Sequence, residues 1–247
     1  MQTYKTNYGT LHIGDLTYIF HKHVEAIEQI VKQNGEHNSV VGLTGGSTPK
    51  AFYLWAAQVK PFSADTLEKV IWSTSDERCV PLESEESNFG QAQRGFLQPL
   101  GVANHLMRPW PVDKKPEDAA AAFEEIREQN GQHNNPFSLC LLGMGEDCHT
   151  ASLFPGSPLL KRDQNSWFAA VEAPGKGWRL TLTPHGIKQC PRTLVTVTGA
   201  GKAEALRDVL EGEYNPQQKP AQLLRESNGK VDWLVDAGAA SKLAFQS

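Results

Sequence analysis

The chain has 247 residues, a length that allows a substantial hydrophobic core without disulfides or bound metal. Its 24 basic and 28 acidic residues give a formal net charge of −4, so no overall positive field favours nucleic acid or an anionic membrane surface. No apolar run reaches the roughly 18 residues of a membrane-spanning helix, and the first residues have no apolar signal-peptide segment. An anionic small substrate would therefore have to be bound by a local set of donors.

The cysteines and histidines argue against a metal or redox centre. Cys79, Cys140, Cys148 and Cys190 are far apart and form no Cys-x-x-Cys pair, which disfavours a zinc knuckle and a redox dithiol. The histidines are scattered, with no spacing typical of a metal site. We therefore predict a soluble, cytoplasmic protein in a reducing compartment, with no metal.

Short apolar runs bounded by turn residues recur along the chain, as expected of central parallel strands covered on both faces. We predict such strands at residues 39–44, 69–74, 138–142, 193–198 and 231–235.

Helical patterns alternate with these strands. Asp15 is placed to cap a helix that ends near Gly35, and the acidic, alanine-rich segment from Pro116 to Asn130 predicts a helix with a solvated face. The alternation predicts one α/β domain over residues 1–247, with a mainly parallel central sheet flanked by helices. Ligands of such folds bind at the carboxyl ends of the strands, so the residues that follow each strand are the candidates for chemistry.

A glycine-rich loop follows the first of these strands. Gly45 and Gly46 precede Ser47, Thr48 and Pro49, and a helical pattern comes next. Glycines let backbone N–H groups approach an anion, and a helix N-terminus with free donors is suited to phosphate. The loop is not a Walker motif, because Ser47 stands where that motif has its second glycine. The alternative is a glycine-rich helix cap without a ligand.

The next predicted strand leads into Asp76, Glu77 and Arg78, which we expect to point into the ligand crevice. A carboxylate there could move protons, and Arg78 could stabilise a phosphate or a developing oxyanion. Ser87 or Asn88 is predicted to cap the helix that follows. The alternative is an ordinary charged cluster on the surface.

The third predicted strand is followed by Gly143, Gly145, Asp147, Cys148 and His149. A neutral imidazole could take a proton from water while a nearby carboxylate orients the ring. The two glycines also suggest a dinucleotide-binding fingerprint, but Cys148 stands at its third glycine and no ribose-binding acid follows in a clear βαβ unit.

Two further cations lie near predicted strands. Arg179 opens a short alternating strand at residues 178–183, and Lys202 lies in the first turn of a helix after the fourth buried strand. A cation at a helix start opposes the helix dipole unless an anion lies between them, which favours a ligand-binding role for Lys202. The alternative is a solvated lysine on an exposed helix.

These segments, in this order along residues 42–240, resemble the glucosamine/6-phosphogluconolactonase superfamily. The matching motifs are Gly-Gly-Ser-Thr-Pro, Asp-Glu-Arg-x-Val-Pro, Ser-Asn-x-Gly, Leu-Gly-Met-Gly-x-Asp-x-His-Thr-Ala-Ser-Leu-Phe-Pro-Gly, Arg-x-Thr-x-Thr, Gly-x-x-Lys and Trp-Leu-Val-Asp-x-Gly-Ala-Ala. The ending Ser-Leu-Phe-Pro-Gly looks like the lactonase branch. The aminosugar-phosphate deaminase branch has a glutamate where Pro155 stands here.

The resemblance implies a Rossmann-like fold and hydrolysis of 6-phospho-D-glucono-1,5-lactone to 6-phosphogluconate, in the oxidative pentose phosphate pathway. It implies that His149 activates water without a covalent intermediate, with Asp147 orienting it. Arg78 would stabilise charge near the lactone carbonyl, and Asp76 would line the pocket. The residues implied to bind the phosphate are Gly45, Gly46, Ser47, Thr48, Arg179 and Lys202.

The resemblance implies no metal or organic cofactor, and we expect a monomer whose partner is a small phosphorylated sugar lactone. Two other functions stay open: an aminosugar-6-phosphate isomerase or deaminase that uses Asp76 to move a proton, and a non-catalytic sugar-phosphate-binding protein. The chain departs from the family at Cys148, where members generally have glycine, and at Glu83, where many lactonases have histidine. The cysteine could require a left-handed backbone, obstruct the pocket, or act as a nucleophile.

Overall fold

The computed structural model describes residues 1–129, 136–161 and 165–244 of the chain. Their largest element is a seven-stranded sheet in the order β1-β2-β10-β9-β6-β3-β4, in which only the β1–β2 hairpin is antiparallel. The strands are β1 (Gln2–Thr6), β2 (Gly9–Ile13), β3 (Ser39–Leu43), β4 (Val70–Thr74), β6 (Leu139–Gly143), β9 (Arg192–Val197) and β10 (Lys230–Val235). The predicted mainly parallel sheet is confirmed, and all five predicted buried strands belong to it.

A second, antiparallel sheet lies beyond the carboxyl edge of the first. It has the order β5-β8-β7, from β5 (Asp76–Arg78), β8 (Gly177–Leu182) and β7 (Phe168–Ala173). The alternating strand predicted at 178–183 is therefore β8. Ser75 links the two sheets, because its N–H donates to Leu43 O (2.7 Å) and its carbonyl accepts from Leu182 N (3.0 Å).

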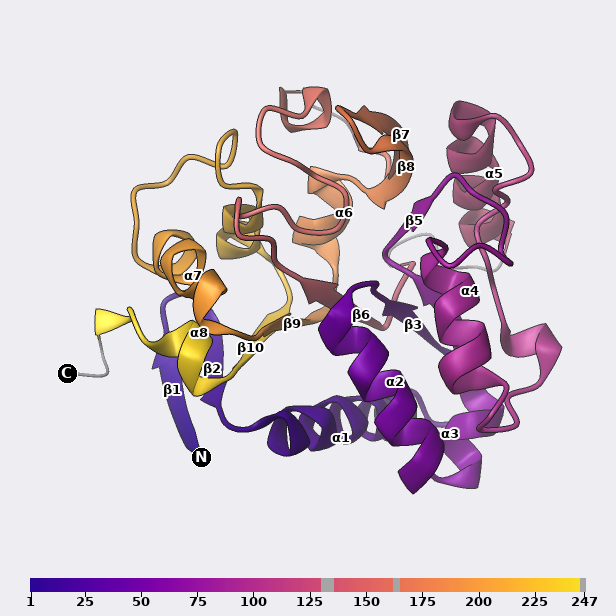
Figure 1. The fold of residues 1–247 in the computed structure, drawn as a ribbon. Coiled ribbons are helices and arrows are strands. Elements are labelled where there is room, and N and C mark those ends of the chain that lie inside the picture. Colours follow the sequence, from indigo (N-terminus) through magenta and orange to yellow (C-terminus); the bar gives the residue numbers. More distant parts are fainter. Residues whose placement is uncertain (130–135, 162–164, 245–247) are drawn as a thin grey trace.

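Helices cover both faces of the large sheet (Figure 1). They are α1 (Leu16–Asn34), α2 (Ser47–Val59), α3 (Ala64–Lys69), α4 (Asn88–Ala92), α5 (Pro116–Gln129), α6 (Pro184–Gln189), α7 (Ala203–Leu210) and α8 (Ala237–Ala240). Shorter turns are the π-helical η1 (Gln93–Leu97) and the 3₁₀-helical η2 (Asn104–Leu106), η3 (Pro158–Lys161), η4 (Ala200–Lys202) and η5 (Pro220–Glu226).

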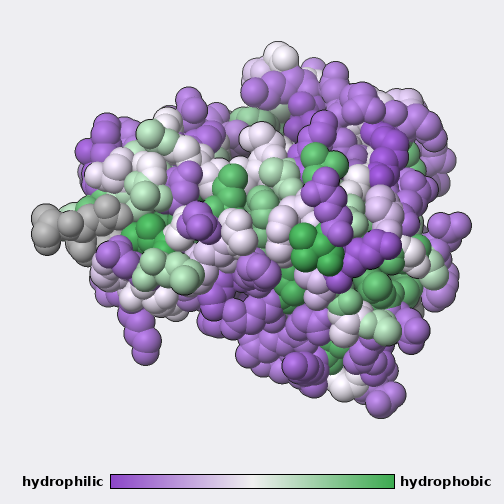
Figure 2. All heavy atoms as spheres, turned by 60° about the horizontal axis from the view of Figure 1, so that its bottom comes forward, coloured by the Kyte–Doolittle hydropathy of each residue, from purple (hydrophilic) through white to green (hydrophobic). Residues whose placement is uncertain are grey.

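Two apolar cores lie on opposite faces of the sheet. Because side chains alternate along a strand, Leu194 of β9 joins the core under α1 and α2, and Val195 joins the core under α5 to α8. Helix α5, predicted to have a solvated face, buries Phe123 of its other face in the second core. Figure 2 shows a face that is mainly hydrophilic with apolar residues between, and α2 exposes Leu54 and Val59.

The strand order of the large sheet reverses between the neighbouring strands β3 and β6. The chain passes from β3 to β4 on one side and from β6 to β9 on the other. A crevice forms at the carboxyl ends of the strands at such a point. Asp15 caps α1 by accepting from Tyr18 N (2.8 Å), and the helix ends before Gly35, as predicted.

Helix α1 carries a histidine into the first core. His23 is 5 % exposed, its ring stacks on Phe52 with centroids 4.8 Å apart, and its Nδ1 lies 2.9 Å from Ile19 O. Burial lowers the pKa of His23 to about 4, because desolvation disfavours the charged ring.

This burial predicts a loss of stability in acid. The pKa of His23 is lower in the folded chain (about 4) than in the unfolded chain (6.5), so between these values only the unfolded state takes up the proton. The free energy of unfolding should therefore fall, by roughly 3 kcal/mol from this group, as the pH drops from 7 to 4.

Urea unfolding of the parent and of His23→Leu at pH 7, 5.5 and 4 measures this contribution. We expect the stability of the variant to fall less steeply with decreasing pH than that of the parent. Parallel pH profiles for the two proteins would contradict a buried, neutral His23.

Candidate active site

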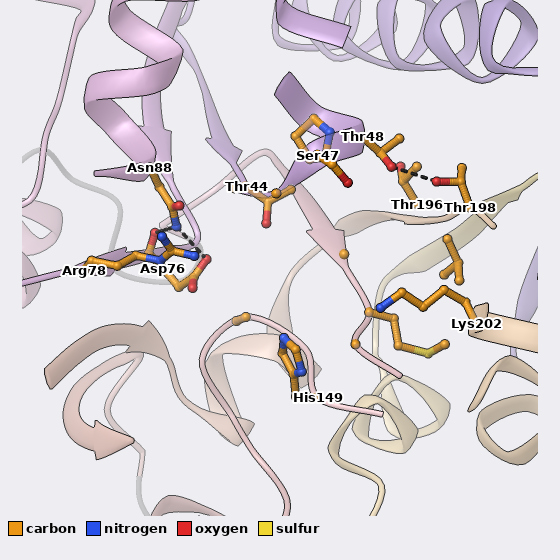
Figure 3. A pocket seen from close by; sticks show the side chains of 18 residues that line it. Thr44, Ser47, Thr48, Asp76, Arg78, Asn88, His149, Thr196, Thr198 and Lys202 are labelled. Carbon is orange, nitrogen blue, oxygen red and sulfur yellow. Dashed lines mark hydrogen bonds between the residues drawn. The ribbon is translucent and has the colours of Figure 1, made fainter. Parts of the chain in front are cut away.

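A cavity of about 250 Å³ opens at the carboxyl ends of β3, β6 and β9 (Figure 3). Its lining consists of Thr44, Gly45, Gly46, Ser47, Thr48, Pro49, Asp76, Arg78, Asn88, Gly143, Met144, Gly145, His149, Ala151, Thr196, Val197, Thr198 and Lys202. Three of the predicted segments, together with Lys202, therefore meet at one place, although they lie up to 158 residues apart in sequence.

One end of the cavity is rich in hydrogen-bond donors. Helix α2 begins there after Gly46, which has φ +114°, and no side chain caps its first turn. The first N–H groups of a helix have no partner within the helix, so this end can accept an anion. Thr48 and Thr198 join two neighbouring turns through their hydroxyls, 2.7 Å apart.

Lys202 lies across the cavity from the start of α2, and its amino group points inward (Figure 3). It ends η4 and stands at the N-cap position of α7. Within the part of the chain that the structure describes, its amino group has no hydrogen-bond or ion-pair partner. A cation so placed is free to pair with a ligand anion.

Strand β5 brings a carboxylate and a guanidinium to the opposite end of the cavity. The alternation of the strand turns Asp76 and Arg78 to the cavity, whereas Glu77 points away. Asp76 is 6 % exposed and accepts from Ser152 Oγ (2.7 Å) and, at 3.4 Å, from Asn88 Nδ2. Both carboxylate oxygens are thus held in place.

The expectation that Glu77 also points into the crevice is wrong. Glu77 is fully buried and accepts from the N–H groups of Arg78, Asn88 and Phe89, each at 2.7 Å. Desolvation raises its pKa, although these hydrogen bonds act in the opposite direction. Its role is to anchor the start of α4, which Ser87 caps at Gly90 N as predicted.

His149 lies at the bottom of the view in Figure 3, on the loop after β6. Its Nδ1 is 2.5 Å from Asp147 Oδ1, and its ring packs on Phe154 with centroids 4.6 Å apart. A carboxylate only accepts, so Nδ1 carries the proton and Nε2 is left as a base. Partial burial acts to raise the pKa of Asp147, but its hydrogen bonds and ion pair with His149 lower it.

Two glycines make room for these side chains. A Cβ on Gly145 would lie 2.0 Å from Nδ1 of His149, and a Cβ on Gly45 would lie 1.9 Å from Oδ1 of Asn88. The same Cβ on Gly145 would lie 2.4 Å from Oδ1 of Asp147. Because His149 and Asp147 are hydrogen-bonded to each other, any side chain at position 145 would displace this pair.

Cys148 adopts a left-handed backbone, with φ +63°. Its Sγ lies 3.7 Å from Ala205 O, in the core rather than in the cavity lining. Burial raises the pKa of the thiol, which disfavours the nucleophilic thiolate. Of the three possibilities for this position, the structure supports the left-handed backbone.

Arg179 is not part of the cavity lining. It pairs with Arg78 across the β5–β8 ladder, and its Nη1 donates to Trp178 O at 3.1 Å. Burial and the charge of Arg78 lower its pKa. Arg179 lies near the start of β8, beside Arg78, and its implied role with Lys202 in phosphate binding stays a prediction.

Sequence reasoning missed Thr196, Thr198, Ser152 and the pocket role of Asn88. Thr198 directly follows β9, so the rule that placed the other site residues could have found it, whereas Thr196 lies within the strand. Ser152 gave no local signal, because its contact with Asp76 spans 76 residues. The described residues contain no cluster of three or more potential metal ligands, and none of their helices is long and apolar enough to cross a membrane.

The fold and the cavity together define an α/β protein with a site suited to a small phosphorylated molecule. The chain belongs to the family described as glucosamine-6-phosphate isomerases/6-phosphogluconolactonase, whose model matches residues 17–233.

Similar proteins include the 6-phosphogluconolactonases of Synechocystis sp. (31 % identity, 88 % of this chain and 89 % of the relative) and Homo sapiens (31 %, 82 % and 80 %). The solved 6-phosphogluconolactonase of Trypanosoma brucei superimposes with a TM-score of 0.82 at 26 % identity, covering 98 % of this chain and all of that one.

The backbone at position 148 predicts that the thiol is dispensable. Cys148→Gly removes a strained left-handed residue, which costs about 1–2 kcal/mol for a residue with a side chain, and leaves the cavity lining unchanged. We expect lactone turnover equal to or above that of the parent.

Cys148→Ala is the matched control, because it removes the thiol and keeps the strained backbone. It should also be active. Loss of turnover in both variants, with the fold intact by circular dichroism, would make the thiol essential and would contradict a mechanism based on His149.

Proposed function

We propose that this chain is a 6-phosphogluconolactonase, which hydrolyses 6-phospho-D-glucono-1,5-lactone to 6-phosphogluconate. The observation that carries the proposal is His149, whose Nδ1 is bonded to Asp147 and whose ring lines a cavity with a donor-rich end. The family and the curated lactonases that cover most of the chain support it.

The substrate would lie with its phosphate at the start of α2. The N–H groups of the first turn, the hydroxyls of Ser47 and Thr48, and the ammonium of Lys202 surround this end of the cavity. Holding the phosphate far from the carbonyl orients the ring and lowers the entropic cost of attack. The lactone carbonyl would then lie toward His149 and Arg78.

Hydrolysis needs a base and stabilisation of charge. Nε2 of His149 takes a proton from water as the oxygen attacks the carbonyl carbon, and Asp147 stabilises the imidazolium. The guanidinium of Arg78 offsets the negative charge on the carbonyl oxygen. As the tetrahedral intermediate collapses, the ring C–O bond breaks, and the leaving oxygen takes the proton back from His149. No covalent intermediate is required.

The deaminase alternative would use Asp76 as a mobile base. Ser152 and Asn88 donate to its two carboxylate oxygens, which restrains it, and Pro155 stands where that branch has glutamate. A solved glucosamine-6-phosphate deaminase shares the fold with a TM-score of 0.77 at 19 % identity, so the fold alone does not separate the two activities. The retained His149–Asp147 pair disfavours a non-catalytic binding protein.

We further propose that the enzyme acts as a cytoplasmic monomer. The four cysteines are free, which fits a reducing compartment.

A coupled assay on freshly prepared 6-phosphogluconolactone tests the function. The 6-phosphogluconate formed is followed by its dehydrogenase, with correction for spontaneous hydrolysis, and glucosamine 6-phosphate is run in parallel. We expect lactone hydrolysis and no ammonia. Ammonia release without lactonase activity would replace this proposal with the deaminase, and binding without either reaction would indicate a sensor.

His149→Ala is expected to lower lactone turnover by about 10²–10⁴-fold, the usual contribution of a general base, with little change in the affinity for 6-phosphogluconate. Asp147→Asn keeps the hydrogen-bonding shape but removes the charge, and should give a smaller loss. A decrease below about tenfold in His149→Ala would contradict the assignment of the base.

Lys202→Met is expected to weaken binding of the phosphorylated lactone by about 10- to 150-fold, the effect of losing one charge-assisted contact worth about 1.5–3 kcal/mol. Binding of unphosphorylated gluconolactone should be unchanged. Arg179→Ala should show the same preference with a smaller loss, because Arg179 lies outside the cavity lining. Equal losses with both substrates would assign these cations to structure rather than to phosphate binding.

A further inference from the structure

The buried His23 donates and accepts in fixed directions. Its Nδ1 lies 2.9 Å from the carbonyl oxygen of Ile19, which can only accept, so Nδ1 carries the ring proton. The ring is neutral at ordinary pH, because burial lowers its pKa to about 4. Nε2 is therefore unprotonated and can only accept.

Thr196 lies on the other side of this ring. Its Oγ1 is 2.9 Å from Nε2 of His23, and because Nε2 only accepts, the hydroxyl of Thr196 must donate. A hydroxyl has one proton, so nothing is left to donate elsewhere. Thr196 is 8 % exposed and lines the cavity near the carboxyl end of β9, where it can offer only lone pairs.

The polarity of Thr196 differs from that of the neighbouring threonine pair. Between Thr48 and Thr198 one hydroxyl donates to the other across 2.7 Å, which leaves one proton free for a ligand. That pair suits a phosphate, whose oxygens accept. Thr196 suits the opposite group, an O–H donor, because phosphate oxygens would meet its lone pairs without a proton between them.

We propose that Thr196 is a specificity-determining residue that accepts a hydrogen bond from a sugar hydroxyl of the substrate, and that His23 is the positioning residue that fixes this polarity. The inference rests on the proposed function and deepens it. Phosphate and sugar hydroxyls would thus be distinguished by adjacent threonines of opposite polarity, and the ligand class is a polyhydroxylated sugar phosphate.

The direction of the buried hydrogen bond is tested without any ligand. In the ¹⁵N-labelled protein at pH 7, the ring nitrogens of His23 should show a protonated Nδ1 and an unprotonated, hydrogen-bonded Nε2. Thr196→Val should move the chemical shift of Nε2 toward that of an unprotonated ring nitrogen that accepts no hydrogen bond. A protonated Nε2 in the parent would overturn the proposal.

The consequence for the ligand is tested by isothermal titration with 6-phosphogluconate. Thr196→Val preserves shape and removes the acceptor, so we expect affinity to fall about 2- to 12-fold, the effect of one neutral hydrogen bond. Thr196→Ser should restore most of it. Inorganic phosphate, tested as a competitor, should bind the three proteins equally, since it makes no use of this acceptor.

Thr193→Val is the matched control, because it makes the same change at the other end of β9, outside the cavity lining. It should bind 6-phosphogluconate as the parent does. The proposal would be overturned if Thr196→Val bound 6-phosphogluconate as tightly as the parent does. It would also be overturned if the variant lost affinity for phosphate and for 6-phosphogluconate equally.

The coupling with His23 completes the test. In the His23→Leu variant the hydroxyl of Thr196 can rotate and is no longer fixed as an acceptor. Thr196→Val should therefore lower the affinity for 6-phosphogluconate less in this variant than in the parent. Additive losses would contradict the role of His23. The lactonase assay tests the proposed function independently of this inference. If the parent hydrolyses the lactone and Thr196→Val binds 6-phosphogluconate as tightly as the parent does, the function stands and this inference fails.

Discussion

The parallel pairing of β3 with both β4 and β6 is the constraint on which the site depends. Parallel strands end at the same edge of a sheet, so the loops after β3, β6 and β9 must meet there. The small sheet is tied to the same edge by Ser75, whose N–H extends the ladder to Leu43 and whose carbonyl pairs with Leu182. This single residue directs the chain from β4 into β5, and thereby brings Asp76 and Arg78 to the cavity.

Most of the large sheet could be predicted from the sequence, because buried parallel strands are continuous apolar runs. Once the strands are placed, most of the site residues can be predicted too, because ligands bind at the carboxyl ends of parallel strands. The small sheet could not be predicted in the same way: β5 has three residues, too few for a period, and pairs with β8 about 100 residues later. The position of Glu77 depends on the same short strand, because only the pairing of β5 with β8 shows that Glu77 points away from Asp76 and Arg78.

Other features depended on contacts that a sequence does not reveal. A lone histidine in an amphipathic helix looks like any partly polar core residue, and His23 gains its significance only from Thr196, 173 residues away. The same holds for Arg179, whose strand was predicted but whose partner, Arg78, follows from the pairing of β5 with β8. The left-handed backbone at Cys148, with φ +63°, likewise follows from the turn around it and not from the residue type.

The loop that carries His149 is strained and held firmly. Cys148 and Ala151, on either side of the histidine, both have left-handed backbones, each at a cost of about 1–2 kcal/mol. Such a conformation persists only where the surroundings fix it. Here Ala221 N donates to the carbonyl of Cys148 (2.9 Å), and Ser152 bonds to Asp76 just beyond the second strained residue. These hydrogen bonds therefore hold the imidazole over Gly145 before substrate arrives, so little of the binding energy is needed to orient the base.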